Sequence, residues 1–214
     1  IERGVVRALV RHLQGRLTLH GSAVAIDGRA VVCVGPSGAG KSTIAAMLVG
    51  AGGELLADDM AAIEVPLDAD APVLVAPSEE AFSLDDAALA ATGLGARDVV
   101  NWEGKWLVPS AKVARAPAPL AAVLALRFGG DAPAVKPLRG LGVLAALVPC
   151  VPRFPTESVE RHTQELDQLE ALARRGLVAE LCRPRRLESA RDAAEAVRAM
   201  IALGPGRNQP FPLP

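Results

Sequence analysis

Hydrophobic positions near the start of the chain follow a helical spacing and then form two strand-like runs. Within residues 2–14 the apolar side chains recur three and four positions apart, which predicts an amphipathic helix. Residues 17–26 and 29–34 are mainly apolar and are joined by Asp27-Gly28, a pair typical of two-residue hairpin turns because both central positions need a positive φ. The pattern therefore predicts a helix followed by a β-hairpin.

The rest of the pattern mixes short strands with helices, divided by clusters of Gly and Pro. We expect helices at residues 43–50, 84–94, 141–148, 163–175 and 189–203, and strands at residues 54–57, 61–65, 73–75, 107–108, 120–128 and 177–182. Because strands and helices do not alternate regularly, we predict an α/β fold of α+β-like character, with a mixed, hairpin-rich sheet and flanking helices. Residues 1–203 are expected to form a single domain, and residues 204–214, rich in Pro and Gly, a loose tail.

Composition narrows the classes of partner and compartment. The 214 residues include 23 Lys and Arg against 24 Asp and Glu, with no Tyr, two Trp and four Phe, which argues against binding of nucleic acid. No run of 18 apolar residues free of charge and Pro is present, so no membrane association is expected. The three cysteines, Cys33, Cys150 and Cys182, are too few and too far apart for a disulfide framework, which favours a reduced, cytoplasmic protein. Cys33 is expected to be a buried small hydrophobic residue.

A complete phosphate-binding motif follows the second strand of the hairpin. It has the form G-x-x-x-x-G-K-[ST], the Walker A pattern, in which backbone N–H groups surround phosphate oxygens, the lysine reaches the β- and γ-phosphates and the next hydroxyl ligates Mg²⁺. The predicted nucleotide-binding residues are Gly35, Ser37, Gly38, Ala39, Gly40, Lys41, Ser42 and Thr43. An incidental Gly-rich turn is the alternative interpretation, and the strand before and helix after the motif argue against it.

Two further segments flank this motif and give the chain a family resemblance. His20 lies in the strand before the loop, and Asp58-Asp59 ends the strand after it. This order and spacing closely resemble the catalytic domain of HPr kinase/phosphorylase and related serine kinases, including those of peptide-modifying clusters. The resemblance is strong over about the first 65 residues and implies a P-loop domain of the PEP-carboxykinase-like kind, with ATP and Mg²⁺ as cofactors and assembly into a homo-oligomer.

The resemblance also implies roles for individual side chains. Asp58 is expected to be the general base, Lys41 to hold the transferred phosphate, and Ser42 and Asp59 to ligate the metal, with the order of the two aspartates open to exchange. His20 is implied to orient Asp58 or to contact the phosphate, and a structural histidine is the alternative. An acidic turn after a strand is the alternative for the aspartate pair.

Further cations and aromatic residues are weaker candidates. Lys105, Arg127 and Arg153 could contact phosphate or acceptor, although a solvated lysine is an equal interpretation for Lys105. Trp102 and Trp106 could stack on adenine, with packing as the favoured interpretation. The arginines from 183 to 186 are interpreted as a solvated face that could hold an acidic peptide.

These observations predict an ATP- and Mg²⁺-dependent kinase that phosphorylates a Ser or Thr hydroxyl on a protein or peptide. Another protein or a peptide is favoured over HPr as the acceptor, because the loop with which that family binds HPr has no clear counterpart here. A nucleotide-binding regulatory module without transfer activity and a kinase of a small hydroxyl compound such as free serine remain as alternatives. The sequence starts at Ile1, so a preceding segment also remains open.

Overall fold

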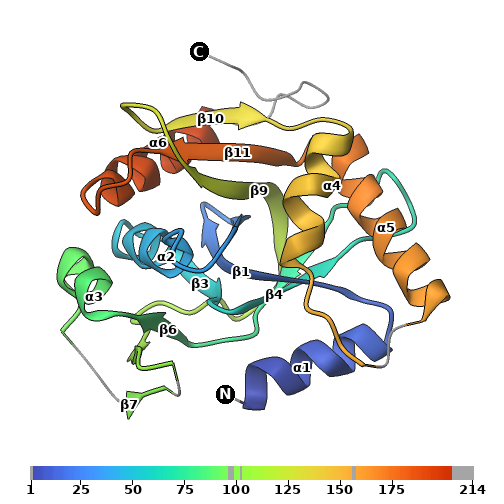
Figure 1. Cartoon of the computed structure of the whole chain (residues 1–214), viewed down its shortest axis with the longest axis horizontal. Helices are drawn as coiled ribbons and strands as arrows, with labels where there is room; N and C mark the ends of the chain where they lie inside the picture. Colours follow the sequence, from blue (N-terminus) through green and yellow to red (C-terminus); the bar gives the residue numbers. More distant parts are fainter. Residues whose placement is uncertain (1, 96–98, 102, 156–157, 204–214) are drawn as a thin grey trace.

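The computed structural model describes residues 2–95, 99–101, 103–155 and 158–203. Its elements agree closely with the expected pattern and form a mixed α/β fold (Figure 1). The helices are α1 (Glu2–Leu13), α2 (Lys41–Gly50), α3 (Asp86–Thr92), α4 (Leu141–Leu147), the 3-10 turn η1 (Val148–Cys150), α5 (Val159–Arg174) and α6 (Ser189–Leu203). The strands are β1 (Leu17–Ile26), β2 (Arg29–Val34), β3 (Glu54–Ala57), β4 (Met60–Glu64), β5 (Leu74–Ala76), β6 (Ala81–Leu84), β7 (Val99–Val100), β8 (Trp106–Pro109), β9 (Ala118–Phe128), β10 (Ala134–Pro137) and β11 (Val178–Arg183).

The main sheet is mixed, as predicted. Its strands follow the order β10-β11-β9-β2-β1-β4-β5, β3 pairs with β1, and β5 pairs additionally with β9. The pairs β2–β9 and β9–β11 are parallel, whereas β1 pairs antiparallel with β2, β3 and β4. A second, small sheet has the order β6-β8-β7.

Alternation along the strands divides the core between the two faces of the main sheet. On β2, Val31 and Cys33 pack in one cluster, with side chains of α2 and α6. Val32 and Val34 pack in the other, with side chains of α4 and α5. Figure 1 accordingly shows α2 and α6 on one side of the central strands and α4 and α5 on the other.

The predicted hairpin is present and positions the phosphate motif. β1 and β2 pair from Gly21↔Val34 to Ile26↔Arg29, and the turn residues Asp27 and Gly28 have φ of 50° and 73°. The first part of β1, before the hairpin pairing begins, pairs with β4, with His20 opposite Met60. One strand thus links the phosphate motif to the segment that follows the aspartate pair.

Some expectations differ from the fold or lie outside the described residues. The strands β6, β7 and β10 were not expected, and the helix expected over 84–94 is divided between the end of β6 and α3. Asp85 caps α3, its side chain accepting a hydrogen bond from the Ala88 N–H at 2.7 Å. The tail 204–214 and Trp102 lie outside the described residues. No helix in the described ranges is both long and apolar enough to cross a membrane.

Candidate nucleotide-binding and phosphotransfer site

The loop between β2 and α2 has the backbone conformation of a phosphate cradle. Gly35, Gly38 and Gly40 have φ of 142°, 78° and 92°, values that side-chain-bearing residues rarely adopt. Gly40 is the N-cap of α2, and no side chain caps that end, so the helix presents free N–H groups and its positive dipole end toward the loop. The sequence therefore folds locally into an anion-binding nest.

Lys41 begins α2 and turns its side chain back into the loop. Its Nζ donates to the carbonyl oxygens of Gly35 at 3.0 Å and Pro36 at 3.2 Å. Burial lowers the pKa of Lys41, while Asp58 and Asp59 raise it. The ammonium is thus held inside the nest, where phosphate oxygens would be its partners.

Asp58 directly follows β3 and lies near Ser42, at the start of the helix that follows the loop. Its Oδ1 accepts from the Ser22 hydroxyl at 2.8 Å and its Oδ2 accepts from the Ser83 N–H at 2.6 Å, and the nearby Ser42 side chain also acts to lower its pKa. Burial raises the pKa of Asp58 to about 8, against these hydrogen bonds. A buried carboxylate next to the Ser42 hydroxyl is a pair of oxygen donors of the kind that Mg²⁺ binds.

Asp59 lies beside Asp58 but faces the solvent side of the site. Its Oδ1 is 3.4 Å from Nδ1 of His20, and both side chains are about half exposed, at 50% and 45%. Burial is the largest cause that lowers the pKa of His20, and the Lys41 charge lowers it further, while Asp59 raises it. A neutral imidazole can donate one hydrogen bond to Asp59, so the two half-exposed side chains are placed to act as a pair.

Glu79 is a site residue that the sequence did not indicate. Its Oε2 accepts from the backbone N–H of Asp58 at 2.5 Å and of Asp59 at 2.7 Å. Burial raises the pKa of Glu79, and these two N–H donors oppose the shift. The Glu79 carboxylate holds the turn in which both aspartates lie. Because its partners are backbone groups, no sequence motif predicts this role.

Lys105 reaches the same site from the turn between β7 and β8. Asn101 builds that turn, its Oδ1 accepting from the N–H of Glu103 at 3.0 Å and of Lys105 at 2.9 Å. The Nζ of Lys105 pairs with Glu103 at 2.8 Å, and its charge contributes to lowering the pKa values of both His20 and Lys41. The candidate cation is thus brought together with the loop and the aspartates.

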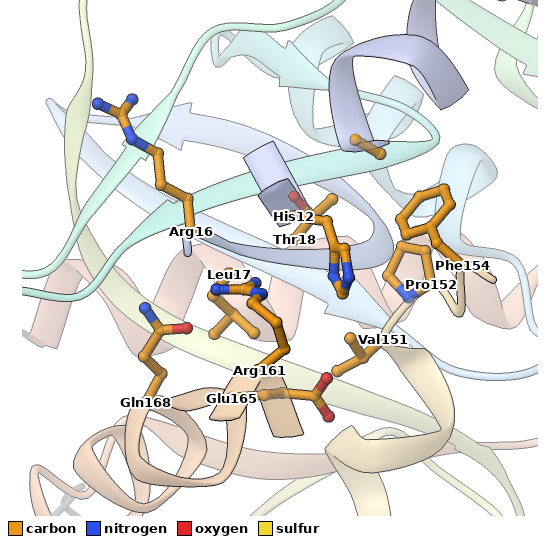
Figure 2. Close-up of a pocket in the computed structure, with 11 residues that line it drawn as sticks. His12, Arg16, Leu17, Thr18, Val151, Pro152, Phe154, Arg161, Glu165 and Gln168 are labelled. Carbon is orange, nitrogen blue, oxygen red and sulfur yellow. The ribbon is translucent and has the colours of Figure 1, made fainter. Parts of the chain in front are cut away.

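Arg127 and Arg153, the other candidate cations, do not line the site cavity. Arg127 is 72% exposed and lies 3.5 Å from Glu180 on the neighbouring strand. Arg153 makes a two-pronged contact with Glu165, at 2.7 and 2.9 Å. Figure 2 shows Glu165 in a second pocket together with His12 and Thr18, and that pocket, at about 10 Å³, holds no more than about one water molecule.

Trp106 also stays out of the cavity. It packs against the core, and its Nε1 donates to Asp86 at 2.7 Å. This contact supports the packing interpretation for Trp106.

Arg183 is a second residue that the sequence did not place at the site. The late arginines were interpreted as a solvated face, and Arg185 and Arg186 are exposed, but Arg183 is only 5% exposed. Its Nη2 donates to the carbonyl oxygen of Ala39 at 3.0 Å, within the phosphate loop. Arg183 ends a strand along which buried and partly exposed residues alternate, and this pattern could have indicated that its side chain is buried.

These residues share one large cavity of about 1180 Å³. It is lined by the phosphate loop, by both aspartates with His20 and Glu79, by Lys105, and by the turn after β11. Its volume exceeds that of a pocket for one drug-sized ligand, so it has room for a nucleotide and an acceptor group together. In the described part of the chain no group of three or more His, Cys, Asp or Glu side chains is arranged to hold a metal ion, so a metal here would depend on phosphate oxygens and water besides Ser42 and Asp58.

Fold and site together define a mixed α/β domain with a phosphate-binding loop and a tandem-aspartate turn. Among solved structures, the fold is similar to that of the Hpr(Ser) kinase/phosphatase from Coxiella burnetii, with 11% sequence identity, a TM-score of 0.44, and coverage of 87% of this chain and 88% of that one. At this level the likeness carries no assignment of activity. No family model matches the sequence, and no curated protein matches it.

Proposed function

We propose that this chain is an ATP- and Mg²⁺-dependent kinase that transfers phosphate to a Ser or Thr hydroxyl on a protein or peptide. The observation that carries the proposal is the tandem-aspartate turn opening on the phosphate loop, with the buried Asp58 carboxylate near Ser42 and the half-exposed Asp59 carboxylate, beside His20, lining the cavity. Phosphoryl transfer depends mainly on positioning and charge stabilisation, and these residues supply both.

The geometry favours an exchange of the roles first assigned to the aspartates. Asp58 is buried and both of its oxygens are engaged, one with Ser22 and one with Ser83, next to Ser42. Ser42 and Asp58 would hold Mg²⁺, which supplies neutralisation of the phosphate charge when bound. Asp59 lines the cavity with an exposed oxygen, and we assign it as the base that accepts the proton of the acceptor hydroxyl.

The remaining side chains orient these groups. His20 would hold Asp59 through Nδ1, and Glu79 holds the backbone of both aspartates. Lys41 would bind the β- and γ-phosphate oxygens in place of the loop carbonyls that it now contacts, and Lys105, which lines the same cavity, would neutralise phosphate charge. The hydroxyl proton would then pass to Asp59 as the acceptor oxygen bonds to the γ-phosphorus, while the bond from that phosphorus to the β–γ bridging oxygen breaks and ADP leaves.

Transfer of label from γ-labelled ATP to Ser- and Thr-containing peptides tests this proposal. Asp59→Asn is expected to slow transfer by about 100-fold or more while ATP still binds, because proton acceptance by a positioned base contributes at least that factor. Lys41→Ala should abolish both label transfer and ATP binding. Asp192→Asn, at an exposed position on α6, is the matched control and should behave as the parent.

Two results would contradict the proposal. Transfer by Lys41→Ala at the parent rate would remove the phosphate loop from the reaction. A parent chain that binds ATP and Mg²⁺ but labels no peptide would favour the regulatory module, and labelling of free serine alone would favour a kinase of small molecules.

A further inference from the structure

The carboxyl ends of three parallel strands meet at the wall of the cavity next to the phosphate loop. β2 ends at Val34 and leads into the loop, β9 ends at Phe128, and β11 ends at Arg183, directly opposite Phe128 in the register. In sheets of parallel strands, ligands bind beyond the carboxyl ends. A nucleotide with its phosphates in the loop therefore has the ends of β9 and β11 as its neighbouring surface.

Arg183 fixes this neighbouring surface relative to the loop. Its guanidinium donates to the Ala39 carbonyl at 3.0 Å and to the Ser189 hydroxyl at 2.8 Å. Its Cζ lies 4.7 Å from the centroid of the Phe128 ring, a cation–π contact. These contacts hold the side chain at the cavity wall. Its Nε is buried without a hydrogen-bond partner, so one donor is unused.

A second, exposed arginine lies over the same ring. The Cζ of Arg185 is 5.4 Å from the Phe128 centroid, and Arg185 lines the cavity together with Leu187, which is 37% exposed. Among the described residues no carboxylate forms an ion pair with Arg185. A planar guanidinium supported by an aromatic ring and flanked by an apolar side chain is a surface on which a flat, aromatic ligand stacks well.

We propose that Phe128, Arg185 and Leu187 form the subsite for the purine base of a nucleoside triphosphate whose phosphates occupy the loop of residues 35–43. This inference rests on the proposed function for its donor nucleotide and adds the part of the site that grips the base. The base is held by its face, through stacking on Arg185 and contact with Leu187, rather than by hydrogen bonds to its edge. Such a subsite accepts adenine and guanine alike.

The test compares a ligand with a base and a ligand without one. Binding of ATP, GTP and inorganic tripolyphosphate to the full chain is measured by calorimetry in the presence of Mg²⁺. The parent should bind ATP and GTP within about threefold of one another and both more tightly than tripolyphosphate. Arg185→Lys keeps the positive charge and removes the planar guanidinium on which the base would stack. It should therefore weaken ATP binding about tenfold and leave tripolyphosphate binding unchanged.

Two further variants separate the subsite from general effects. Phe128→Leu removes the ring beneath the guanidinium and should act as Arg185→Lys does, and unchanged tripolyphosphate binding would show that its loop is intact. Arg191→Lys makes the same exchange at an exposed position on α6, outside the cavity, and should change neither affinity.

The subsite is overturned if Arg185→Lys leaves ATP affinity unchanged, or if it weakens ATP and tripolyphosphate equally. It is also overturned if the parent binds tripolyphosphate as tightly as ATP. These outcomes are distinct from failure of the proposed function. A chain that prefers ATP over tripolyphosphate but transfers no label would overturn only the proposed kinase activity. A chain that binds neither ATP nor tripolyphosphate would overturn both the kinase activity and the base subsite.

Discussion

Individual side chains in the site are fixed by backbone partners more than by each other. Glu79 is bonded to two N–H groups, Arg183 to the Ala39 carbonyl, and Lys41 to two carbonyls of its own loop. Charge-assisted bonds of this kind are shorter and stronger than neutral ones, and they place each charged group without a second ionised side chain. Glu79, Arg183 and Lys41 are therefore held in place without an ion pair to another described side chain of the cavity.

Cys33 offers a pH-dependent prediction at this scale. Burial raises the pKa of its thiol to about 12, from a usual value of 9.0. Since the unfolded chain loses this proton first, the thiol's contribution to stability is complete below pH 9 and is lost as the pH rises from 9 toward 12. The urea concentration at the unfolding midpoint should be lower at pH 10.5 than at pH 8 for the parent. The decrease should be smaller for Cys33→Ala.

The same burial predicts the reactivity of the three thiols. Cys33 and Cys150 are buried, and burial raises both pKa values, whereas Cys182 is partly exposed. A thiol reagent at pH 8 should modify Cys182 first, as mapped by peptide mass analysis. Faster modification of Cys33 in the folded chain would contradict its position in the core.

The sequence predicts residues of the site only where a local motif places them. The loop from Gly35 to Thr43 and the Asp58-Asp59 pair have a fixed spacing, and the structure brings them together with His20 and Lys105. Glu79 and Arg183 act on backbone groups that lie 20 and 144 positions away, at Asp59 and Ala39, so no local pattern contains the interaction. Arg127 and Arg153 had suitable chemistry, but each one's location depended on the tertiary fold.

Elements were predicted well where hydrophobic periodicity is strong. α2, α5, α6, the β1–β2 hairpin and β9 lie within a few residues of their expected bounds, because each buries a continuous face. β10 was missed because it is a short edge strand containing Lys136 and Pro137, and such strands carry little apolar signal. β6 was missed because its four residues run directly toward the cap of α3.

The junction of loop and α2 makes a prediction at the scale of the element. Gly40 has a positive φ, and a Cβ there would collide with the guanidinium of Arg183. Gly40→Ala is therefore expected to destabilise the fold by about 1–3 kcal/mol and to weaken ATP binding, since strain and collision both fall on the phosphate nest. Chemical denaturation and calorimetry measure the two effects.

Gly50, at the other end of the same helix, is the matched control. A Cβ there has no neighbour within 4 Å, and its backbone is helical. Gly50→Ala should stabilise the chain by about 0.5–1 kcal/mol and leave ATP binding unchanged. Equal effects of the two substitutions would contradict the strained geometry at Gly40.

At the scale of the whole molecule, the site draws on both ends of the described chain. The cavity is lined by residues from Gly4 in α1 to Leu187 before α6, and the two core clusters share the strands of one sheet. If residues 1–203 form a single domain, a ligand in this cavity should stabilise all of it. We expect one cooperative thermal transition by both circular dichroism and calorimetry.

Nucleotide should raise the temperature of that transition. At a concentration about 100 times Kd, a ligand that binds only the folded state adds about 2.7 kcal/mol, which for 214 residues corresponds to a shift of roughly 5–11 °C. Lys41→Ala should show no shift. Two separate transitions, with only one moved by ATP and Mg²⁺, would show that the chain is divided into independent domains.

The position of β11 has a consequence for how the protein is made. It is the last strand among the described residues, yet it lies between β10 and β9, and it carries the arginine that donates a hydrogen bond to Ala39. A nascent polypeptide that ends before Val178 already contains the residues of the phosphate loop but lacks Arg183, which donates a hydrogen bond to that loop. Nucleotide capture is therefore expected to begin only after β11 has been synthesised and has paired with β9, so that ATP stabilises chains that contain β11 and leaves shorter ones exposed to proteolysis.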